Sequence, residues 1–396
     1  MRIGLFTDTY YPQISGVATS VSALRRQLLA YGHTVYIFTT TDPMARETEP
    51  DIFRIPSLPF VSKRRIGIRY PGLKKTVRSL GLELIHTHTE FSLGQLGRQM
   101  ADELGIPLVH TMHTIYEEYT HYIAPHGLPD TVAKSAVKRL VRSFCNLADA
   151  VIVPTEKTYD LLNGYGVFKE ISVIPTGIEL DKFSPAQYEE ARLQACRASL
   201  GLRKHDRVLL YIGRISEEKN IEELLGHIKA YGTGKTNLKF LLIGDGPARE
   251  KLEAKASAMG LDDMVIFGGQ RPQSEIGLYY QLGDVFLSAS QSETQGLTYI
   301  EAMAAGLPVI AKADPCLDGI LKNGVEGYTF RTRADFLDAM DRVLTDEALR
   351  LRMSNAASAA AVRFSAQHFG RQVLSLYYSV MTQGKAAEYR NYTAAY

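Results

Sequence analysis

Two glutamates eight residues apart mark the segment that is best suited to chemistry. Glu293 stands in a polar loop, and Glu301 follows it in an apolar, helix-like run that opens near Gly296-Leu297-Thr298. Eight helical residues span about 12 Å, roughly the distance from a sugar ring past a diphosphate to a ribose. A carboxylate accepts two neighbouring hydroxyl donors, and N–H groups at a helix start can bind phosphates. An ordinary capped helix with two surface glutamates fits the same spacing, so both interpretations stay open.

Two cations precede this segment in the chain. Arg214 and Lys219 follow the β-branched run at 208–212 and come just before a helical pattern. Positive side chains beside helix N–H groups predict a diphosphate site, although lysine and arginine are also common in solvated turns. The nearby Gly244-Asp245-Gly246 lacks the third glycine of a dinucleotide fingerprint, so hydride transfer is a poor fit.

Alternating strand-like and helix-like runs must position these residues. Strands are expected at 2–7, 35–39, 84–87, 108–112, 150–154 and 171–175, and again at 208–212, 240–243, 264–267, 285–288 and 308–310. Helices are expected at 17–31, 186–200, 221–231, 248–259, 274–282, 299–305 and 363–381, before a polar tail that frays. The alternation predicts an α/β fold of two Rossmann-like, doubly wound parallel-sheet domains that face each other across a cleft. Ligands would bind at the carboxyl ends of the strands.

Composition excludes several other classes of protein. The 396 residues carry a net charge of +2, which does not suit a generally basic nucleic-acid wrapper or an acidic disordered chain. The three cysteines are far apart with no CxxC spacing, which argues against a disulfide scaffold or a zinc ribbon. No apolar run approaches the ~18 residues of a membrane span. The start of the chain reads as a strand and not as a signal peptide. We therefore expect a cytoplasmic protein.

The segment from Glu293 to Glu301, with Gly213-Arg214 and Lys219 upstream, resembles the glutamate-x7-glutamate signature of family 4 glycosyltransferases. These are retaining enzymes with two Rossmann domains in the B-type fold. The loop at 12–20 with Gly16, the linker at 175–178 and the C-terminal helix also fit this family. One departure is Gln295, where many members carry phenylalanine. The resemblance implies an N-terminal acceptor domain over 1–178, a donor domain over 179–362, and a helix within 363–396 that crosses back to the N-terminal domain.

The resemblance also implies a role for each matching residue. Arg214 and Lys219 would hold the donor diphosphate and stabilise the leaving group. Glu293 would contact the hydroxyls of the transferred sugar, and Glu301 the ribose. No metal or other cofactor is expected, in keeping with the lack of a DxD motif. The remaining donor contacts would come from Gly16, Gly296, Leu297 and Thr298.

Histidines cluster in the first half of the chain. Six of the ten are His86, His88, His110, His113, His121 and His126. Such a cluster permits a zinc hypothesis, but histidines at strand ends serve polar active sites equally well, so no metal is predicted. The family resemblance puts His113 close to the reacting sugar carbon, where it would give electrostatic or hydrogen-bonding support. The role of the His86/His88 pair stays open.

The stretch at 86–92, with 111–114 and 119–122, is similar to a bacterial branch of the family that transfers glucose from UDP-glucose to diacylglycerol. This resemblance implies a UDP-glucose donor, a diacylglycerol acceptor and a place at the inner face of the cell membrane. A soluble acceptor such as a sugar or hydroxy acid, a UDP-sugar epimerase of the same fold, and a non-catalytic lipid-binding module remain alternatives. The sequence does not distinguish glucose from galactose or N-acetylglucosamine, and it does not indicate an oligomeric state.

Two basic stretches support a membrane partner. Eight cations and no acidic residue lie between Ile52 and Leu82. Four more cations, again without an acid, lie within 131–147, where apolar residues recur at helical spacing. Basic amphipathic segments bind anionic bilayers with about 1 kcal/mol per cation near the headgroups. A solvated face over the domain core is the plainer alternative, and a donor-sugar site does not suit a nucleic-acid partner. The predicted membrane contacts are Lys63, Arg64, Arg65, Arg69, Lys74, Lys75, Lys134, Lys138, Arg139 and Arg142.

Overall fold

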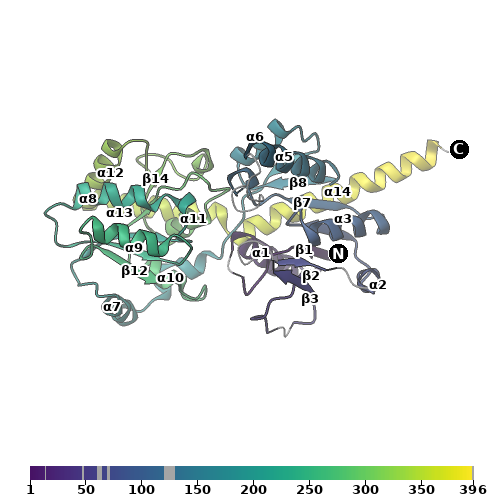
Figure 1. The fold of residues 1–396 in the computed structure, drawn as a ribbon. Coiled ribbons are helices and arrows are strands. Elements are labelled where there is room, and N and C mark those ends of the chain that lie inside the picture. Colours follow the sequence, from purple (N-terminus) through teal and green to yellow (C-terminus); the bar gives the residue numbers. More distant parts are fainter. Residues whose placement is uncertain (14, 47–48, 60–64, 69–71, 120–129, 395–396) are drawn as a thin grey trace. The chain divides into compact units, whose positions relative to one another are not determined.

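The structure is a computed structural model that describes residues 1–13, 15–46, 49–59, 65–68, 72–119 and 130–394 (Figure 1). The chain divides into two compact units: unit 1 comprises Met1–Gly177 with Ala366–Tyr396, and unit 2 comprises Ile178–Ser365. The boundaries expected from the sequence, at 178 and 362, lie one and three residues from these divisions.

Unit 1 is built on a parallel sheet in the order β3-β2-β1-β6-β7-β8-β9. Its strands are β1 (Arg2–Phe6), β2 (Thr34–Thr40), β3 (Ile52–Ile55), β6 (Leu84–Thr87), β7 (Leu108–Thr111), β8 (Ala150–Val153) and β9 (Ile171–Val173). A small antiparallel pair, β4 (Ser57–Pro59) and β5 (Arg65–Gly67), follows β3. Its helices are α1 (Gly16–Ala30), α2 (Leu73–Ser79), α3 (Ser92–Leu104), α5 (Asp130–Asn146), α6 (Glu156–Tyr165) and α14 (Ala366–Ala394), with a 3₁₀ turn η2 (Tyr116–Tyr119).

Both faces of this sheet are covered, which explains why its central strands β1, β6, β7 and β8 are buried along almost their whole length. Side chains alternate along each strand, so Ile3 and Leu5 pack with α1 and α14 on one face. Phe6 points to the opposite face and packs with residues of α2, α3 and α5. The C-terminal helix α14, yellow in Figure 1, therefore belongs to the core of unit 1, where Phe369 and Val373 are buried.

Unit 2 repeats the architecture with a parallel sheet in the order β12-β11-β10-β13-β14-β15. Its strands are β10 (Arg207–Ile212), β11 (Leu238–Ile243), β12 (Val265–Gly269), β13 (Val285–Ser288), β14 (Val309–Lys312) and β15 (Gly327–Phe330). Its helices are α7 (Glu190–Ser199), α8 (Ile221–Gly232), α9 (Arg249–Ala258), α10 (Ile276–Tyr280), α11 (Leu297–Ala304), α12 (Arg333–Thr345) and α13 (Glu347–Ala361). Short 3₁₀ turns are η3 (Leu180–Phe183), η4 (Pro185–Gln187), η5 (Glu217–Lys219), η6 (Pro315–Leu317) and η7 (Val362–Phe364).

Each sheet has one point where the strand order reverses. The first strand of the unit lies inside the sheet, between the second strand and the fourth: β1 lies between β2 and β6, and β10 between β11 and β13. The crossover helices leave such a point toward opposite faces, which opens a crevice beyond the carboxyl ends of the two central strands. Ligand sites are therefore expected after β1 and β6 in unit 1, and after β10 and β13 in unit 2.

The sequence prediction of two parallel α/β sheets is confirmed, but several elements differ from it. Helices α2, α3, α6, α12 and α13 were not predicted. Strands β3 and β15 were not predicted, and each lies at an edge of its sheet. Gly16, expected in a loop, is the first residue of α1. The expected tail beyond residue 381 continues α14 as far as Ala394, and no proline follows Pro315 to end that helix. In the described part of the chain, no helix is both long enough and apolar enough to span a membrane.

We predict that Tyr377→Phe destabilises unit 1. Tyr377 is fully buried, and its hydroxyl lies 2.6 Å from Nδ1 of His86 on β6. Removing the hydroxyl leaves a buried imidazole nitrogen without that partner, which costs about 1–3 kcal/mol of the free energy of unfolding. Urea denaturation should measure this loss. Tyr378→Phe is the control, because Tyr378 is half exposed and should change stability by less than ~0.5 kcal/mol. Equal effects of the two substitutions would contradict the prediction.

Candidate active site

In unit 2, the loops after the two central strands carry the predicted donor residues. The loop after β10 contains Arg214 and ends in the 3₁₀ turn η5, whose last residue is Lys219. The loop after β13 contains Glu293 and leads into α11. Because β10 and β13 are neighbours in parallel register, with Leu209 opposite Val285, both loops leave the same edge of the sheet.

Lys219 and Glu293 meet directly. The Lys219 ammonium donates to Oε1 of Glu293 at 2.6 Å, across 74 residues of sequence. The two side chains are only 15% and 20% exposed, so solvent screens the pair less than a surface pair. Arg214 has an exposed side chain on the same loop, and its carbonyl accepts a hydrogen bond from the buried hydroxyl of Tyr211 at 2.9 Å. Tyr211 thus anchors the backbone that carries Arg214.

The start of α11 is built around a left-handed glycine. Gly296 has φ 75° and ψ 60°, and no side chain caps the helix. A Cβ at this position would lie 2.4 Å from the ring of Tyr299, so only glycine fits. The first helical residues, Leu297 and Thr298, therefore present backbone N–H groups at the positive end of the helix dipole. This is the N-terminus that the sequence predicted as a phosphate contact.

Glu301 lies one turn further along α11 in a buried setting. The hydroxyl of Tyr280, itself fully buried, donates to Oε2 of Glu301 at 2.7 Å. Burial raises the pKa of Glu301 to about 7, and only part of that shift is offset by the Tyr280 hydrogen bond and the charge of Lys182. The carboxyl is thus poised to change its ionisation near neutral pH.

The Gly244-Asp245-Gly246 turn has a structural explanation. A Cβ on Gly244 would lie 1.8 Å from the carbonyl oxygen of Gly213, so the loop after β11 can pack against the loop after β10 only with glycine here. Backbone hydrogen bonds join the two loops: Ile215 donates to Asp245 at 3.0 Å, and Ala248 donates to Ile215 at 3.1 Å. These contacts fix the path of the loop that carries Arg214.

In unit 1, the corresponding edge of the sheet gathers Asp8 and the histidine cluster. The carboxylate of Asp8, after β1, accepts hydrogen bonds from the hydroxyls of Thr89 and Ser92 and from the backbone N–H of Leu93. Burial raises its pKa despite these three donors. Sequence reasoning missed Asp8, although its position directly after the first strand was the available signal.

The predicted histidines have different environments. His86 faces the α14 side of the sheet, with Nδ1 on Tyr377 and Nε2 2.7 Å from the hydroxyl of Thr111. His88, at the carboxyl end of β6, has Nδ1 3.0 Å from Nε2 of the half-buried His113. Its own Nε2 is buried and finds no hydrogen-bond partner among the residues that the structure describes. Burial lowers the pKa of His113 to about 3 and that of His88 well below its usual value. Both imidazoles are therefore neutral near pH 7, and one of the two facing nitrogens donates its N–H to the other.

His110 faces away from that pair. Its Nε2 lies 3.3 Å from Glu90 Oε1, and the hydroxyl of Tyr116 donates to the other oxygen of Glu90. Within the described ranges, no three His, Cys, Asp or Glu side chains are grouped so as to hold a metal ion. His121 and His126 lie outside the described residues.

The first basic stretch is acid-free in sequence but not in space. Lys74 and Arg78 on α2 both pair with Glu103 of α3, the second at 2.7 Å. Arg65 donates to the hydroxyl and carbonyl oxygens of Ser57, both at 2.7 Å, within the β4–β5 pair. Lys75 is exposed, whereas Lys63, Arg64 and Arg69 lie outside the described residues.

The second basic stretch forms helix α5. Lys134 pairs with Asp130, the first residue of the helix, at 2.7 Å. Lys138 donates to the carbonyl of Gly164 at 2.9 Å. Arg139 and Arg142 are exposed along the helix. In the described part of the chain, Lys75, Lys138, Arg139 and Arg142 are thus exposed, and no ion pair joins them to an acidic side chain.

Comparisons with known proteins agree with this architecture. Residues 14–182 match the model described as Glycosyltransferase Family 4, and residues 194–360 match Glycosyl transferases group 1. The solved sucrose-phosphate synthase of Thermosynechococcus elongatus superposes with a TM-score of 0.77 at 24% identity, covering 96% of this chain and 99% of that one. That similarity establishes the B-type glycosyltransferase fold.

Two curated relatives align along almost the whole chain. The alpha-monoglucosyldiacylglycerol synthase of Streptococcus pneumoniae is 42% identical over 95% of this chain and 85% of its own length. The enzyme of the same name from Acholeplasma laidlawii is 34% identical over 95% of this chain and 96% of its own length. With both family models matched and identity at this level along the chain, the protein belongs to glycosyltransferase family 4 and is a glycosyltransferase.

Proposed function

We propose that this enzyme transfers glucose from UDP-glucose to the free hydroxyl of diacylglycerol, with retention of the α configuration, at the inner face of the cell membrane. The products are α-monoglucosyldiacylglycerol and UDP. The proposal is carried by the Lys219–Glu293 pair at the reversal point of the unit 2 sheet, in a chain related along 95% of its length to alpha-monoglucosyldiacylglycerol synthases. The names of those relatives support the choice of sugar and acceptor.

The charged groups and backbone N–H groups of unit 2 suit the binding of UDP-glucose. Arg214 and Lys219 would bind the diphosphate, and the N–H groups at the start of α11 would bind its oxygens. Glu293 would accept hydrogen bonds from glucose hydroxyls. Glu301 would accept them from the ribose, in the way that a carboxylate accepts two neighbouring donors. UDP-glucose is a co-substrate here, and the two cations supply the charge that a divalent metal would otherwise provide.

The transfer of glucose needs only the donor and the acceptor, and no further reactant. The bond between glucose C1 and the β-phosphate oxygen breaks, and its electron pair stays with UDP. A bond from C1 to the acceptor oxygen forms on the same face of the sugar, and the acceptor proton passes to the departing phosphate. Positive charge held beside that phosphate stabilises the transition state more than the ground state, because charge develops there as the bond breaks. His113, neutral at pH 7, would support the sugar by hydrogen bonding.

Helix α5 supports the membrane part of the proposal. We call its solvent side, with the adjoining loop, the α5 surface: Val132, Arg139, Leu140, Arg142, Leu147 and Phe168. Phe168 is 78% and Leu147 54% exposed, which is unusual for such large apolar side chains. The Phe168 N–H donates to Oδ1 of Asn146 at 2.9 Å, so the loop is held against the end of α5. Apolar side chains beside arginines suit an anionic bilayer.

We predict that Lys219→Ala lowers kcat/KM for UDP-glucose by about 100-fold or more, because the leaving diphosphate loses a preorganised cation. The measurement is the transfer of radiolabelled glucose from UDP-glucose into lipid extract in the presence of diacylglycerol vesicles. Lys251→Ala is the matched control, since Lys251 pairs with exposed Glu217 nearby and should leave the rate within twofold. A Lys219→Ala enzyme within threefold of wild type would refute the donor role. UDP release that did not depend on diacylglycerol would point to an epimerase or a soluble acceptor.

We expect UDP affinity to depend on the ionisation of Glu301. Below its pKa of about 7 the carboxyl is protonated, and the ribose hydroxyls then lose a charged acceptor. The dissociation constant for UDP should rise as pH falls from 8 to 5, approaching about tenfold per unit below pH 7. Calorimetric titration should also detect proton release on binding at pH 7. Glu301→Gln separates this effect from the titration of UDP itself: the same steep profile in that variant would contradict the assignment.

We predict that Arg139→Glu weakens binding to anionic phosphatidylglycerol vesicles by about tenfold, because a cation near the headgroups contributes about 1 kcal/mol and its reversal adds repulsion. Phe168→Ala should weaken binding further by removing an inserted apolar ring. Co-sedimentation with vesicles is the measurement. Arg352→Glu, a reversal at an exposed arginine of unit 2, is the control and should have little effect. Equal loss in both reversals would indicate a response to net charge and not to the α5 surface.

A further inference from the structure

Asn220, the residue directly after Lys219, has an unusual backbone. With φ 51° and ψ 37° it is, among the residues that the structure describes, the one non-glycine residue in the left-handed region. It ends the 3₁₀ turn η5, where its N–H donates to the carbonyl of Glu217 at 3.0 Å. It also precedes the first residue of α8, Ile221. The left-handed conformation of Asn220 therefore sets the angle between the turn that carries Lys219 and the helix α8 that follows it.

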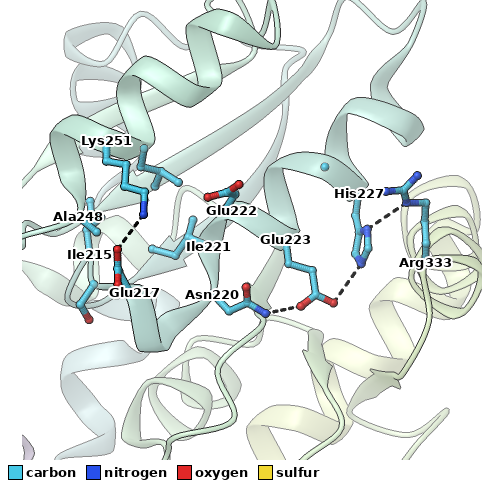
Figure 2. Close-up of a pocket in the computed structure, with 13 residues that line it drawn as sticks. Ile215, Glu217, Asn220, Ile221, Glu222, Glu223, His227, Ala248, Lys251 and Arg333 are labelled. Carbon is cyan, nitrogen blue, oxygen red and sulfur yellow. Dashed lines mark hydrogen bonds and ion pairs between the residues drawn. The ribbon is translucent and has the colours of Figure 1, made fainter. Parts of the chain in front are cut away.

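The side chain of Asn220 is clamped. Its amide donates to Oε2 of Glu223, in the first turn of α8, as the dashed line in Figure 2 marks. An asparagine that precedes a helix commonly caps the helix with its side chain, but no such cap is formed here. Asparagine tolerates the left-handed region better than other residues with a Cβ, though at a cost that the surroundings must offset. The bond to Glu223 supplies part of that compensation.

Glu223 is itself held from other directions. The ammonium of Lys312, the last residue of β14, donates to its Oε2 at 2.6 Å, and both side chains are about one-fifth exposed. Nε2 of His227 lies 3.4 Å from Oε1 of Glu223, and Arg333 contacts the other ring nitrogen of His227 at 3.4 Å (Figure 2). β14 is the sheet neighbour of β13, the strand that leads to Glu293. Glu223 thereby ties the Lys219 turn to the part of the sheet that positions the partner of Lys219.

We propose that Asn220 and Glu223 are positioning residues for Lys219: Glu223 holds Asn220 in the left-handed conformation, which directs the Lys219 ammonium toward Glu293 and the donor diphosphate. This inference rests on the proposed donor role of Lys219. Neither residue touches the donor. Substituting either residue would change the position of the Lys219 ammonium but would remove no group that contacts the donor. It would therefore weaken the binding of UDP and UDP-glucose and leave the binding of diacylglycerol unchanged.

The test compares calorimetric UDP affinity and steady-state kinetics in the full chain. Asn220→Ala should weaken UDP binding by at least tenfold and raise KM for UDP-glucose, with KM for diacylglycerol unchanged. Asn220→Gly should stay within about threefold of wild type, because glycine adopts the left-handed conformation without strain. Glu223→Ala should weaken UDP binding about fivefold. Glu222→Ala is its control, since Glu222 pairs with exposed Lys255 at 3.1 Å and no hydrogen bond to Asn220 is marked in Figure 2.

The results separate a failure of the proposed donor role of Lys219 from a failure of the positioning role of Asn220 and Glu223. If Lys219→Ala leaves UDP affinity unchanged, the proposed donor role fails, and this inference fails with it. If Lys219→Ala weakens binding but Asn220→Ala and Glu223→Ala do not, only the positioning role is overturned. Equal losses for alanine and glycine at position 220 would also overturn it. Should Asn220→Ala not fold, the comparison of Glu223→Ala with Glu222→Ala decides the matter, with melting temperatures recorded for both.

Discussion

The parallel pairing of β10 with β13 is the constraint on which the candidate donor site depends. Leu209 and Leu210 lie opposite Val285 and Phe286, although about 75 residues separate the two strands. The loops that follow must then emerge side by side, and Lys219 reaches Glu293 at 2.6 Å. The left-handed Gly296 adds the N-terminus of α11 to the second of these loops. Cation, carboxylate and helix N–H groups thus come together through one topological feature of the sheet.

Unit 1 uses the same topology but fills its reversal point with buried polar groups. Such groups are costly unless they are hydrogen-bonded, and most of them are. His86 satisfies both ring nitrogens, one with Thr111 and one with Tyr377, so the polar network also ties the last helix to the first sheet. His88 differs, because its Nε2 has no hydrogen-bond partner within the described part of the chain. His86 therefore has a structural role, whereas His88 lies beside the candidate site residue His113.

Much of the fold was predictable because the local patterns were strong. The central strand β13 is a short, mostly apolar run, and its predicted bounds agree with the structure, as do those of β6. The edge strands β3 and β15 were missed because Arg54 interrupts the apolar run of the first and Gly327 opens the second, which weakens their strand patterns. The edge strands β9 and β12 are no more buried but were predicted. The isolation of Lys74 and Lys134 from acids was also misjudged, since Glu103 reaches Lys74 from another helix and Asp130 stands just before the stretch considered.

The two α/β sheets, the chemical types of the residues after their strands and the family of the chain could all be predicted from the sequence. These properties follow from local periodicity and short motifs, which do not depend on contacts between distant segments. Tertiary structure alone decided which groups meet: Lys219 with Glu293, His88 with His113, Tyr377 with His86, and Asn220 with a Glu223 that is held by Lys312. It also raised the pKa of Glu301 and buried Asp8. Burial and strand order are properties of the folded sheet with its covering helices, so they arise only when segments far apart in the chain pack together.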